Sequence, residues 1–250
     1  MANVPGDRRA ARDRGKSTDG FRFAVGISTV IGSRKKQRAL GTRGRKLSRA
    51  EKHEQIRKAL LQAAAKVVGA EGYSDAMVSA ITARAGVAQG TFYNYFTTRQ
   101  DLFDQLLPGL TGEMLDFIKA RSSGQANDVE RERKGFKAFF EFLLLKPEFY
   151  RILYESELFA PEAYQRHLAI VAEGYTRVLR RAGAAGELKT YNPRELEAIA
   201  FILMGSREYL CMRYARSDGE IVDLPDFVIE AYMKLVTGGL WNPPAGRRGK

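Results

Sequence analysis

The chain contains very few of the residues that build disulfides, metal sites or nucleophilic catalytic centres. Its 250 residues include one cysteine, two histidines and one tryptophan. The lone Cys211 permits no internal disulfide and fits a reducing compartment, and a small buried hydrophobe is its simplest interpretation. Neither His53 nor His167 has a metal-ligand spacing with this cysteine or with a carboxylate cluster. We therefore predict no metal site.

Enzyme motifs and long apolar segments are missing as well. No G-x-S-x-G, phosphate-binding glycine loop or dinucleotide fingerprint occurs, so we expect no catalytic residues, no cofactor and no enzyme activity. An apolar run over 21–31 follows basic residues, but no cleavage site comes before Arg34. It is also far shorter than the ~20 apolar residues that span a bilayer. These absences predict a cytoplasmic protein without a membrane partner.

Positive charge is concentrated at the amino end. The formal net charge is +12, from 41 Lys and Arg against 29 Asp and Glu. Residues 1–49 hold 14 of the basic and 3 of the acidic side chains, so they carry +11 and the rest of the chain +1. The composition of 1–47 predicts a disordered basic extension. Two interpretations stay open: an arm that follows the DNA backbone, or a solvated tail.

Residues 77–96 carry the clearest functional pattern, two short helices joined by a tight turn. Val78, Ile81 and Ala85 share one face of the first helix. Gly86 then breaks the period, because glycine adopts the positive φ that a sharp turn requires at little steric cost. Such a pair is typical of a helix-turn-helix, whose second helix enters the major groove of DNA.

The second helix, predicted over about 89–96, has one apolar and one polar face. Phe92 and Phe96 lie four residues apart, so together they can hold the helix to the core. The opposite face bears Asn94 and Gly90, and the missing side chain of Gly90 lets the backbone approach DNA closely. From the pattern alone, an ordinary helical hairpin in an all-helical core is the alternative.

The run from residue 55 to 102 resembles the DNA-binding region of the tetracycline-repressor-like (TetR) family of transcriptional regulators. The matching pieces are Ala63-Ala64, Glu71-Gly72-Tyr73, Val78 with Ile81, Ala85-Gly86-Val87, Gly90-Thr91-Phe92-Tyr93-Asn94-Tyr95-Phe96 and Asp101-Leu102-Phe103. The chain departs from the family pattern at Met77, Thr82 and Ala88. Met77 replaces a usual Ser or Thr cap, so we expect Asp75 to cap that helix instead.

The resemblance and the polar face together predict which residues contact DNA. Asn94 and Gln89 can hydrogen-bond base edges, and the tyrosines can reach phosphate or sugar. The predicted DNA-contacting set is Lys46, Arg49, Ser79, Gln89, Gly90, Thr91, Tyr93, Asn94, Tyr95 and Arg99.

The remaining sequence predicts helices throughout and no convincing strand or repeat. Ser48 and Glu51 form a capping box, Asn192-Pro193 opens a long helix, and Pro108-Gly109 predicts a kink. We therefore predict an all-α chain with a three-helix N-terminal helix-turn-helix domain and a helical C-terminal ligand-binding and dimerisation domain. The expected divisions are 1–47, the basic extension; 48–98, the DNA-binding domain; 99–240, the effector-binding and dimerisation domain; and 241–250, a tail.

The family resemblance gives the C-terminal domain two functions. An aromatic-rich middle could line a cavity for a small apolar or aromatic effector, although plain core packing explains any single aromatic as well. The predicted effector-binding residues are Phe136, Phe140, Tyr150, Tyr154, Tyr175, Met204 and Arg207. For Arg207 the alternative is an ordinary exposed or interface pair with Glu208. The last two long helices are expected to form the homodimer interface through Leu196, Ile199, Leu203, Phe227, Ala231, Tyr232 and Leu235, which could equally be intramolecular core.

These features predict a ligand-responsive transcriptional repressor that binds a palindromic operator in double-stranded DNA as a homodimer. A constitutive DNA-binding protein without an effector is the first alternative. An interaction module whose basic arm binds RNA or a membrane surface is the second. A hollow C-terminal domain would favour the regulator over the first, and binding to a specific palindrome would exclude the second.

Overall fold

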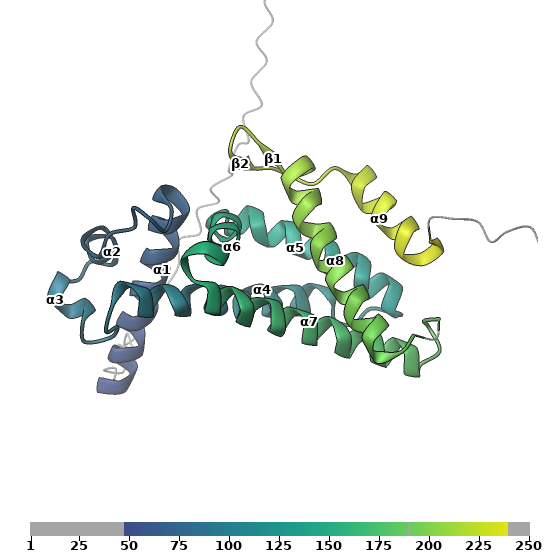
Figure 1. Ribbon diagram of the computed structural model, residues 1–250, viewed down its shortest axis with the longest axis horizontal. Helices are drawn as coiled ribbons and strands as arrows, with labels where there is room; N and C mark the ends of the chain where they lie inside the picture. Colours follow the sequence, from purple (N-terminus) through teal and green to yellow (C-terminus); the bar gives the residue numbers. More distant parts are fainter. Residues whose placement is uncertain (1–47, 190, 240–250) are drawn as a thin grey trace, which may run out of the picture. The chain divides into compact units, whose positions relative to one another are not determined.

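The chain folds as a series of helices with one very short hairpin (Figure 1). The computed structural model describes residues 48–189 and 191–239, so Lys46, the predicted basic extension and the predicted tail lie outside the described residues. The elements are α1 (Arg49–Glu71), α2 (Val78–Ala85), α3 (Gln89–Phe92), α4 (Arg99–Ser122), α5 (Asp128–Leu145), α6 (Glu148–Phe159), α7 (Pro161–Ala184), α8 (Pro193–Tyr214), β1 (Arg216–Ser217), β2 (Glu220–Ile221) and α9 (Asp226–Gly238). The all-α class and the N-terminal helix-turn-helix are confirmed.

Several helices begin where the sequence supplies a capping group. At α1, the Ser48 hydroxyl accepts from the Glu51 backbone N–H at 3.2 Å, and the Glu51 carboxylate accepts from the Ser48 N–H at 2.8 Å. The same reciprocal pair forms at α8 between Asn192 and Glu195, followed by Pro193 in the first turn. Each box satisfies N–H groups that have no partner inside the helix, so both predicted starts are confirmed.

Three local predictions are wrong. The start of α2 has Met77 at the N-cap position with no side-chain hydrogen bond, so Asp75 does not cap it. Helix α3 ends at Phe92 rather than Phe96, because the N–H groups of Asn94 and Tyr95 bond carbonyls three residues back, at 3.1 and 2.9 Å. The two-residue strands β1 and β2 pair antiparallel around Asp218 and Gly219, a hairpin too short to give an alternating pattern.

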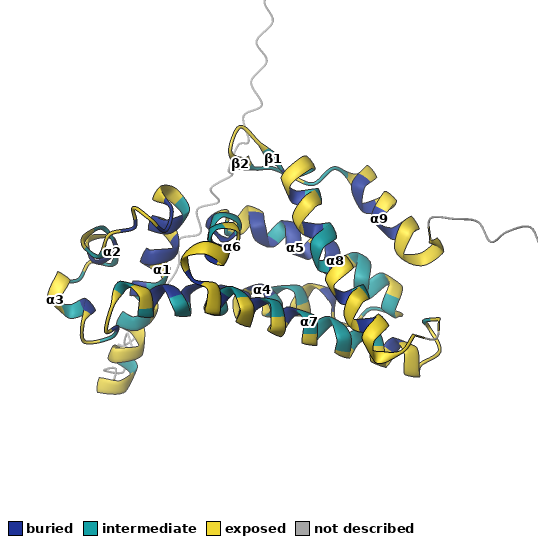
Figure 2. Cartoon of the chain, viewed as in Figure 1, coloured by how far each residue is buried: buried dark blue, intermediate teal, exposed yellow. Residues whose placement is uncertain are grey.

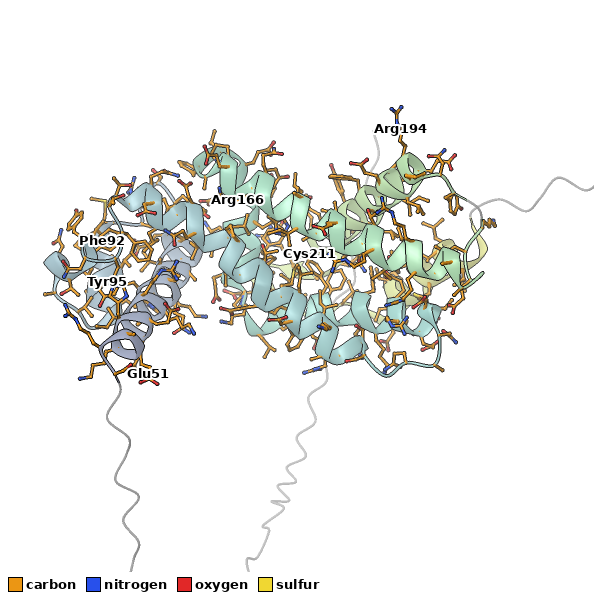
Figure 3. The ribbon with its side chains drawn as sticks, turned by 90° about the horizontal axis from the view of Figure 1, so that it is seen from below. Glu51, Phe92, Tyr95, Arg166, Arg194 and Cys211 are labelled. Atoms are coloured by element: carbon orange, nitrogen blue, oxygen red, sulfur yellow. The ribbon has the colours of Figure 1, made fainter. Side chains whose placement is uncertain are left out.

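Helix α4 continues through Pro108, where a kink was predicted. Proline has no N–H, so the carbonyl of Asp104, four residues earlier, loses its helical partner. Arg166 on α7 donates to that carbonyl at 2.6 Å. Arg166 is labelled in Figure 3, beside the long helices that it joins. A neighbouring helix therefore supplies the hydrogen bond that the proline removes.

The long helix α4 connects the N-terminal helices α1 to α3 to the rest of the described chain. It packs against α1, and along its length against α5, α6 and α7, while α7 packs against α8 and α5 against α9. The buried faces of these helices turn toward one another (Figure 2). They form one apolar cluster that runs from Ile81 and Phe92 through Leu107 to Phe149 and Met233. Two functional regions, the α2–α3 pair and the C-terminal helices, thus share a core.

Candidate functional site

The turn between α2 and α3 has the geometry that the sequence predicts. Gly86 has φ +70°, and the following Val87 N–H donates to the Thr82 carbonyl at 3.1 Å. A Cβ on Gly86 would meet nothing within 4 Å, so the backbone angle, and not lack of space, is what favours glycine here. Ile81 and Phe92 are fully buried on either side of the turn. The core thus fixes the angle between the two short helices.

The polar face of α3 points away from this core. Phe92 and Tyr95 are labelled in Figure 3 among the side chains of the N-terminal helices. Tyr93 is 57% exposed, and Arg49, Ser79, Gln89, Gly90 and Asn94 are exposed as well, whereas Thr91 and Tyr95 are half-buried. The Tyr95 ring packs on the ring of His53, with centroids 4.4 Å apart. Lys46 is not described, and Arg99 is half-buried. The other predicted DNA-contacting residues therefore lie at the surface of the N-terminal helices, two of them partly covered.

Arg99, a member of the predicted DNA-contacting set, makes hydrogen bonds within the chain. Its Nη1 donates to the carbonyls of Ser74 at 3.3 Å and Ala76 at 3.5 Å. Its guanidinium also lies over the Phe103 ring, 5.4 Å from the centroid. Arg99 braces the connection from α1 to α2, and a phosphate contact by this side chain stays a prediction.

A polar network that the sequence did not reveal ties α1 to the start of α4. Arg57 on α1 donates to Gln105, and Gln105 donates to the Asp101 carboxylate at 2.6 Å. That carboxylate also accepts from the Thr97 backbone N–H at 2.8 Å, and this bond holds the pKa of Asp101 below its usual range. Arg57 and Gln105 are 48 residues apart, so no local sequence pattern could pair them.

The C-terminal helices line a cavity of about 980 Å³ that is partly open to solvent. Its wall is built by α4, α5, α6, α7 and α8. Cys211, labelled in Figure 3, is one of the lining residues, and burial raises the pKa of its thiol to about 11, as fits a small buried hydrophobe. A cavity of this size lies in the upper part of the range found for small-molecule sites.

Five of the seven predicted effector-binding residues line this cavity: Tyr150, Tyr154, Tyr175, Met204 and Arg207. The prediction is wrong for Phe136 and Phe140. The face of α5 that lines the cavity carries Gly135 and Phe139, whereas Phe136 stacks on Tyr232 of α9 with ring centroids 3.8 Å apart. Aromatic density located the right helix but could not show which of its faces meets the cavity.

Arg207 is buried in the cavity wall at the junction of four helices. It donates to the Glu132 carboxylate at 2.7 Å, and Tyr232 donates to the same oxygen at 2.6 Å. Its guanidinium also lies 5.0 to 5.5 Å from the ring centroids of Phe136, Tyr175 and Tyr232. The alternative that the sequence left open, an ordinary exposed or interface residue, is therefore wrong. A buried charge needs partners of this kind.

His167 is a polar group of the cavity wall that sequence reasoning missed. It is buried, with 5% of its surface exposed, and its Nδ1 lies 2.7 Å from the Thr111 hydroxyl. Burial lowers its pKa to about 4, so the ring is neutral at pH 7. A histidine at helical spacing on α7 gives no sign by itself that its ring turns inward.

The predicted dimer residues separate into two groups. Leu196, Leu203 and Tyr232 are buried within the chain and Ile199 is half-buried, as the alternative of an intramolecular core predicts. Phe227, Ala231 and Leu235 are exposed on one face of α9. On α8, a different set of apolar side chains is exposed: Ile202 at 66%, Tyr209 at 71% and Met212 at 44%, while Phe201, 44% exposed, also lines the cavity. We refer to the exposed Ile202, Tyr209 and Met212 of α8, with Phe227, Ala231 and Leu235 of α9, as the apolar surface on α8 and α9.

Helix α6 contacts both the DNA-binding helices and the cavity. Its Glu148 accepts from Lys66 of α1 at 2.8 Å, and Arg151 donates to the Ala70 carbonyl at 2.8 Å near the carboxyl end of α1. The same helix contributes Leu153 and Tyr154 to the cavity wall. Helix α6 therefore contacts α1 and also lines the cavity.

Comparison with known proteins agrees with this geometry. The profile of the family described as bacterial regulatory proteins, tetR family, matches residues 60–106. The transcriptional regulator YvdT of Bacillus subtilis is 42% identical over 65 residues, which cover 26% of this chain and 34% of YvdT. The transcriptional activator FasR of Mycolicibacterium smegmatis is 23% identical over 206 residues, or 82% of this chain and 90% of FasR.

Similarity to solved structures extends over the C-terminal helices. The transcriptional regulator FadR from Bacillus subtilis, solved in complex with stearoyl-CoA, superposes with a TM-score of 0.59. It is 19% identical, and the match covers 74% of this chain and 99% of that one, which shows a shared fold. Within residues 48–189 and 191–239, every helix is too short or too polar to cross a membrane.

Proposed function

Since the chain belongs to the tetR family of bacterial regulatory proteins, we propose that it is a ligand-responsive repressor that binds a palindromic operator as a homodimer in the cytoplasm. One observation carries this proposal: a helix-turn-helix with an outward polar face and a cavity of about 980 Å³ are joined by shared helices. A constitutive DNA-binding protein has no need of such a cavity.

The proposed DNA contacts come from α3 and the residues around it. Exposed Gln89, Tyr93 and Asn94 supply amide and hydroxyl groups of the kinds that read base edges and phosphates in a major groove. Gly90 offers an open backbone, since a Cβ there would meet nothing within 4 Å. We propose that Arg49 and Ser79, exposed in the first turns of α1 and α2, contact backbone phosphates.

The proposed dimer uses the apolar surface on α8 and α9. Ile202 and Tyr209 are seven residues apart on α8, and Phe227, Ala231 and Leu235 are four apart on α9, so each helix presents one stripe. Exposed apolar surface of this kind is costly in water and is typical of an interface. Two copies related by a two-fold axis would present two α3 helices to the two halves of a palindrome.

The proposed effector is an apolar molecule of the size of a long-chain acyl group. The regulator FadR is described in complex with stearoyl-CoA, and this chain has the same fold with a cavity in its helical domain. Filling the cavity would move the wall that α6 contributes and, through Glu148 and Arg151, the end of α1. The spacing of the two recognition helices would then no longer fit successive major grooves.

The first test selects DNA and then adds a probe ligand. The full chain is incubated with a library of random duplexes, and we expect a palindrome whose half-sites lie about one helical turn, or a multiple of it, apart. Octadecanoic acid and octadecanoyl-CoA are then titrated into the complex and should release the DNA. No enriched sequence would contradict the DNA-binding proposal, whereas enrichment with no response to either probe would favour constitutive binding.

The second test examines the contact between α1 and α6. A Cβ on Gly69 would lie 2.4 Å from the Cβ and 2.9 Å from the Cα of Glu148, so Gly69→Ala must push the two helices apart. We expect this variant to bind the probe ligand but to release operator less completely. Gly112→Ala is the matched control, because its Cβ would meet nothing within 4 Å. Equal release by all three proteins would show that coupling does not pass through this contact.

A further inference from the structure

The hydrogen bond between His167 and Thr111 fixes where the proton of the imidazole lies. The Thr111 hydroxyl is 2.8 Å from the carbonyl of Leu107, its partner four residues earlier in α4, and 2.7 Å from His167 Nδ1. A hydroxyl has one proton, and the Leu107 carbonyl can only accept. If that proton pointed to Nδ1, two oxygen atoms would face each other at 2.8 Å without a proton between them. Both short contacts are hydrogen bonds only when the Thr111 hydroxyl donates to the Leu107 carbonyl and His167 Nδ1–H donates to the Thr111 oxygen.

The other ring nitrogen, Nε2, is then a lone-pair acceptor. It has no hydrogen-bond partner within the described part of the chain. It also keeps some accessible surface, unlike the fully buried polar atoms that lack a partner, Tyr73 Oη and Arg216 Nε. His167 lines the cavity, so the surface that Nε2 keeps is cavity surface. The neutral ring cannot turn this atom into a donor at pH 7, because Nδ1 already holds the proton.

An unpaired acceptor on the cavity wall favours a ligand that carries a hydrogen-bond donor. A wholly apolar ligand would remove water from Nε2 and leave it without a partner, which is unfavourable. A carboxylate or a thioester offers only acceptor atoms, so it would place lone pairs against a lone pair. A ligand with an O–H group at this point would instead supply the missing proton.

We propose that the effector is a hydroxylated apolar molecule whose hydroxyl group donates to His167 Nε2. This inference rests on the proposed function, since it names the ligand class of the same cavity. A hydroxyl is the smallest group that supplies a donor while the rest of the chain stays apolar and packs on Leu153, Met204 and the other wall residues. Thr111 is a positioning residue: it fixes the tautomer, and α4 holds it in place.

The test compares ligands that differ only by the hydroxyl. Octadecanoic acid and a series of its monohydroxy isomers are titrated into the full chain, and the dissociation constants are measured by calorimetry. We expect one hydroxyl position to bind about 10-fold more tightly than the parent acid, and isomers hydroxylated far from it to bind more weakly than the parent.

Variants assign that preference to the imidazole. In His167→Phe the preferred isomer should lose its advantage, because the acceptor is gone while a ring of similar size fills the wall. Thr111→Val leaves His167 in place but frees Nδ1, so the preference should fall, whereas Thr111→Ser keeps the hydroxyl and should keep the preference. The thermal midpoint of each variant shows whether it is folded, and the Thr111 pair tests the idea even if His167→Phe does not fold.

The outcomes separate this inference from the proposed function. If the parent acid binds and releases operator but no isomer is preferred, the hydroxyl inference is wrong and the regulator proposal stands. If the preference exists but is the same in His167→Phe and Thr111→Val, another group reads the hydroxyl and the inference is again wrong. If neither the acid nor any isomer binds, the apolar effector and the hydroxyl inference both fail.

Discussion

At the scale of single residues, the structure separates exposed side chains of the helix-turn-helix from those already occupied by contacts within the chain. Asn94 and Tyr93 are exposed and make no side-chain hydrogen bond to another described residue, whereas Arg99 is occupied by two backbone carbonyls. Both kinds occur in the same stretch of sequence, and their residue types do not distinguish them. Burial and hydrogen bonding therefore decide which positions are worth testing for recognition.

Asn94→Ala should weaken binding to the selected operator by about 1–3 kcal/mol, the range for a well-placed contact with a base edge. Binding to random duplex should change much less, because phosphate contacts supply most of it. Fluorescence anisotropy with both duplexes measures the two affinities. Gln165→Ala, exposed on α7, is the matched control. Wild-type operator affinity in the Asn94 variant would remove this residue from the recognition set.

His167 should make the stability of the protein fall in mild acid. Its pKa is about 4 in the fold and 6.5 as an unperturbed group, so the unfolded chain binds the proton first. The stabilisation is complete above pH 6.5 and is lost as the pH falls toward 4. Between pH 7 and pH 5 this one group should cost about 2 kcal/mol of unfolding free energy. Urea unfolding at both pH values should show a smaller loss in His167→Gln, and an equal loss would place the titration elsewhere.

At the scale of elements, contacts between helices explain the local departures from the sequence pattern. Pro108 does not end α4, because Arg166 of α7 occupies the carbonyl that the proline leaves free. Gly69 lets α6 approach α1 so closely that even a methyl group would collide with Glu148. The positions of α6 and α7 thus depend on single residues in α1 and α4.

A double-mutant cycle tests the contact at Pro108. Arg166→Ala should destabilise the protein by about 1 kcal/mol, since the Asp104 carbonyl loses its protein donor. In the Pro108→Ala background the same change should cost less, because the new backbone N–H bonds that carbonyl within the helix. Urea unfolding of the four proteins gives the coupling energy. Additive effects would show that Arg166 stabilises the fold by some other contact, such as its pairing with Glu162 at 3.7 Å.

At the scale of the whole molecule, the proposed activity needs two copies of the chain. The described helices bury their core faces within one copy, yet α8 and α9 keep an apolar surface exposed. A single α3 helix would meet half of a palindrome. Dimerisation and specific DNA binding should therefore be lost together when that surface is changed.

Ile202→Glu should convert the protein to a monomer, because a carboxylate at the centre of the apolar surface would be buried without a partner. Ile202 is 66% exposed in one copy, so the fold should survive the change. Sedimentation velocity measures the association state, and anisotropy should show operator affinity lowered at least about tenfold. Leu158→Glu, at a position 78% exposed on α6, is the matched control. A dimeric Ile202 variant would move the interface to another surface.

Much of the architecture follows from the sequence by itself. Ser48, Asn192 and Pro193 determine helix starts through hydrogen bonds to residues within one turn, so local sequence suffices to predict them. Gly86 between two apolar periods predicts the helix-turn-helix for the same reason, since the angle of a tight turn depends on neighbouring residues. Helical spacing places Gly90 opposite the buried Phe92, whereas the exposed Tyr93 and Asn94 lie in the turn that follows α3.

Other features depend on residues that only the tertiary structure brings together. Helical spacing shows that α5 and α8 are apolar, but each helix has more than one apolar face. Packing decides that Phe139 of α5 lines the cavity and that Phe136 packs on α9. The partners of Arg207 and His167 lie 75 and 56 residues away in the chain. Local chemistry therefore determined the helices and the DNA-binding motif, whereas the cavity, its polar groups and the exposed apolar surface on α8 and α9 were decided by the packing of distant helices.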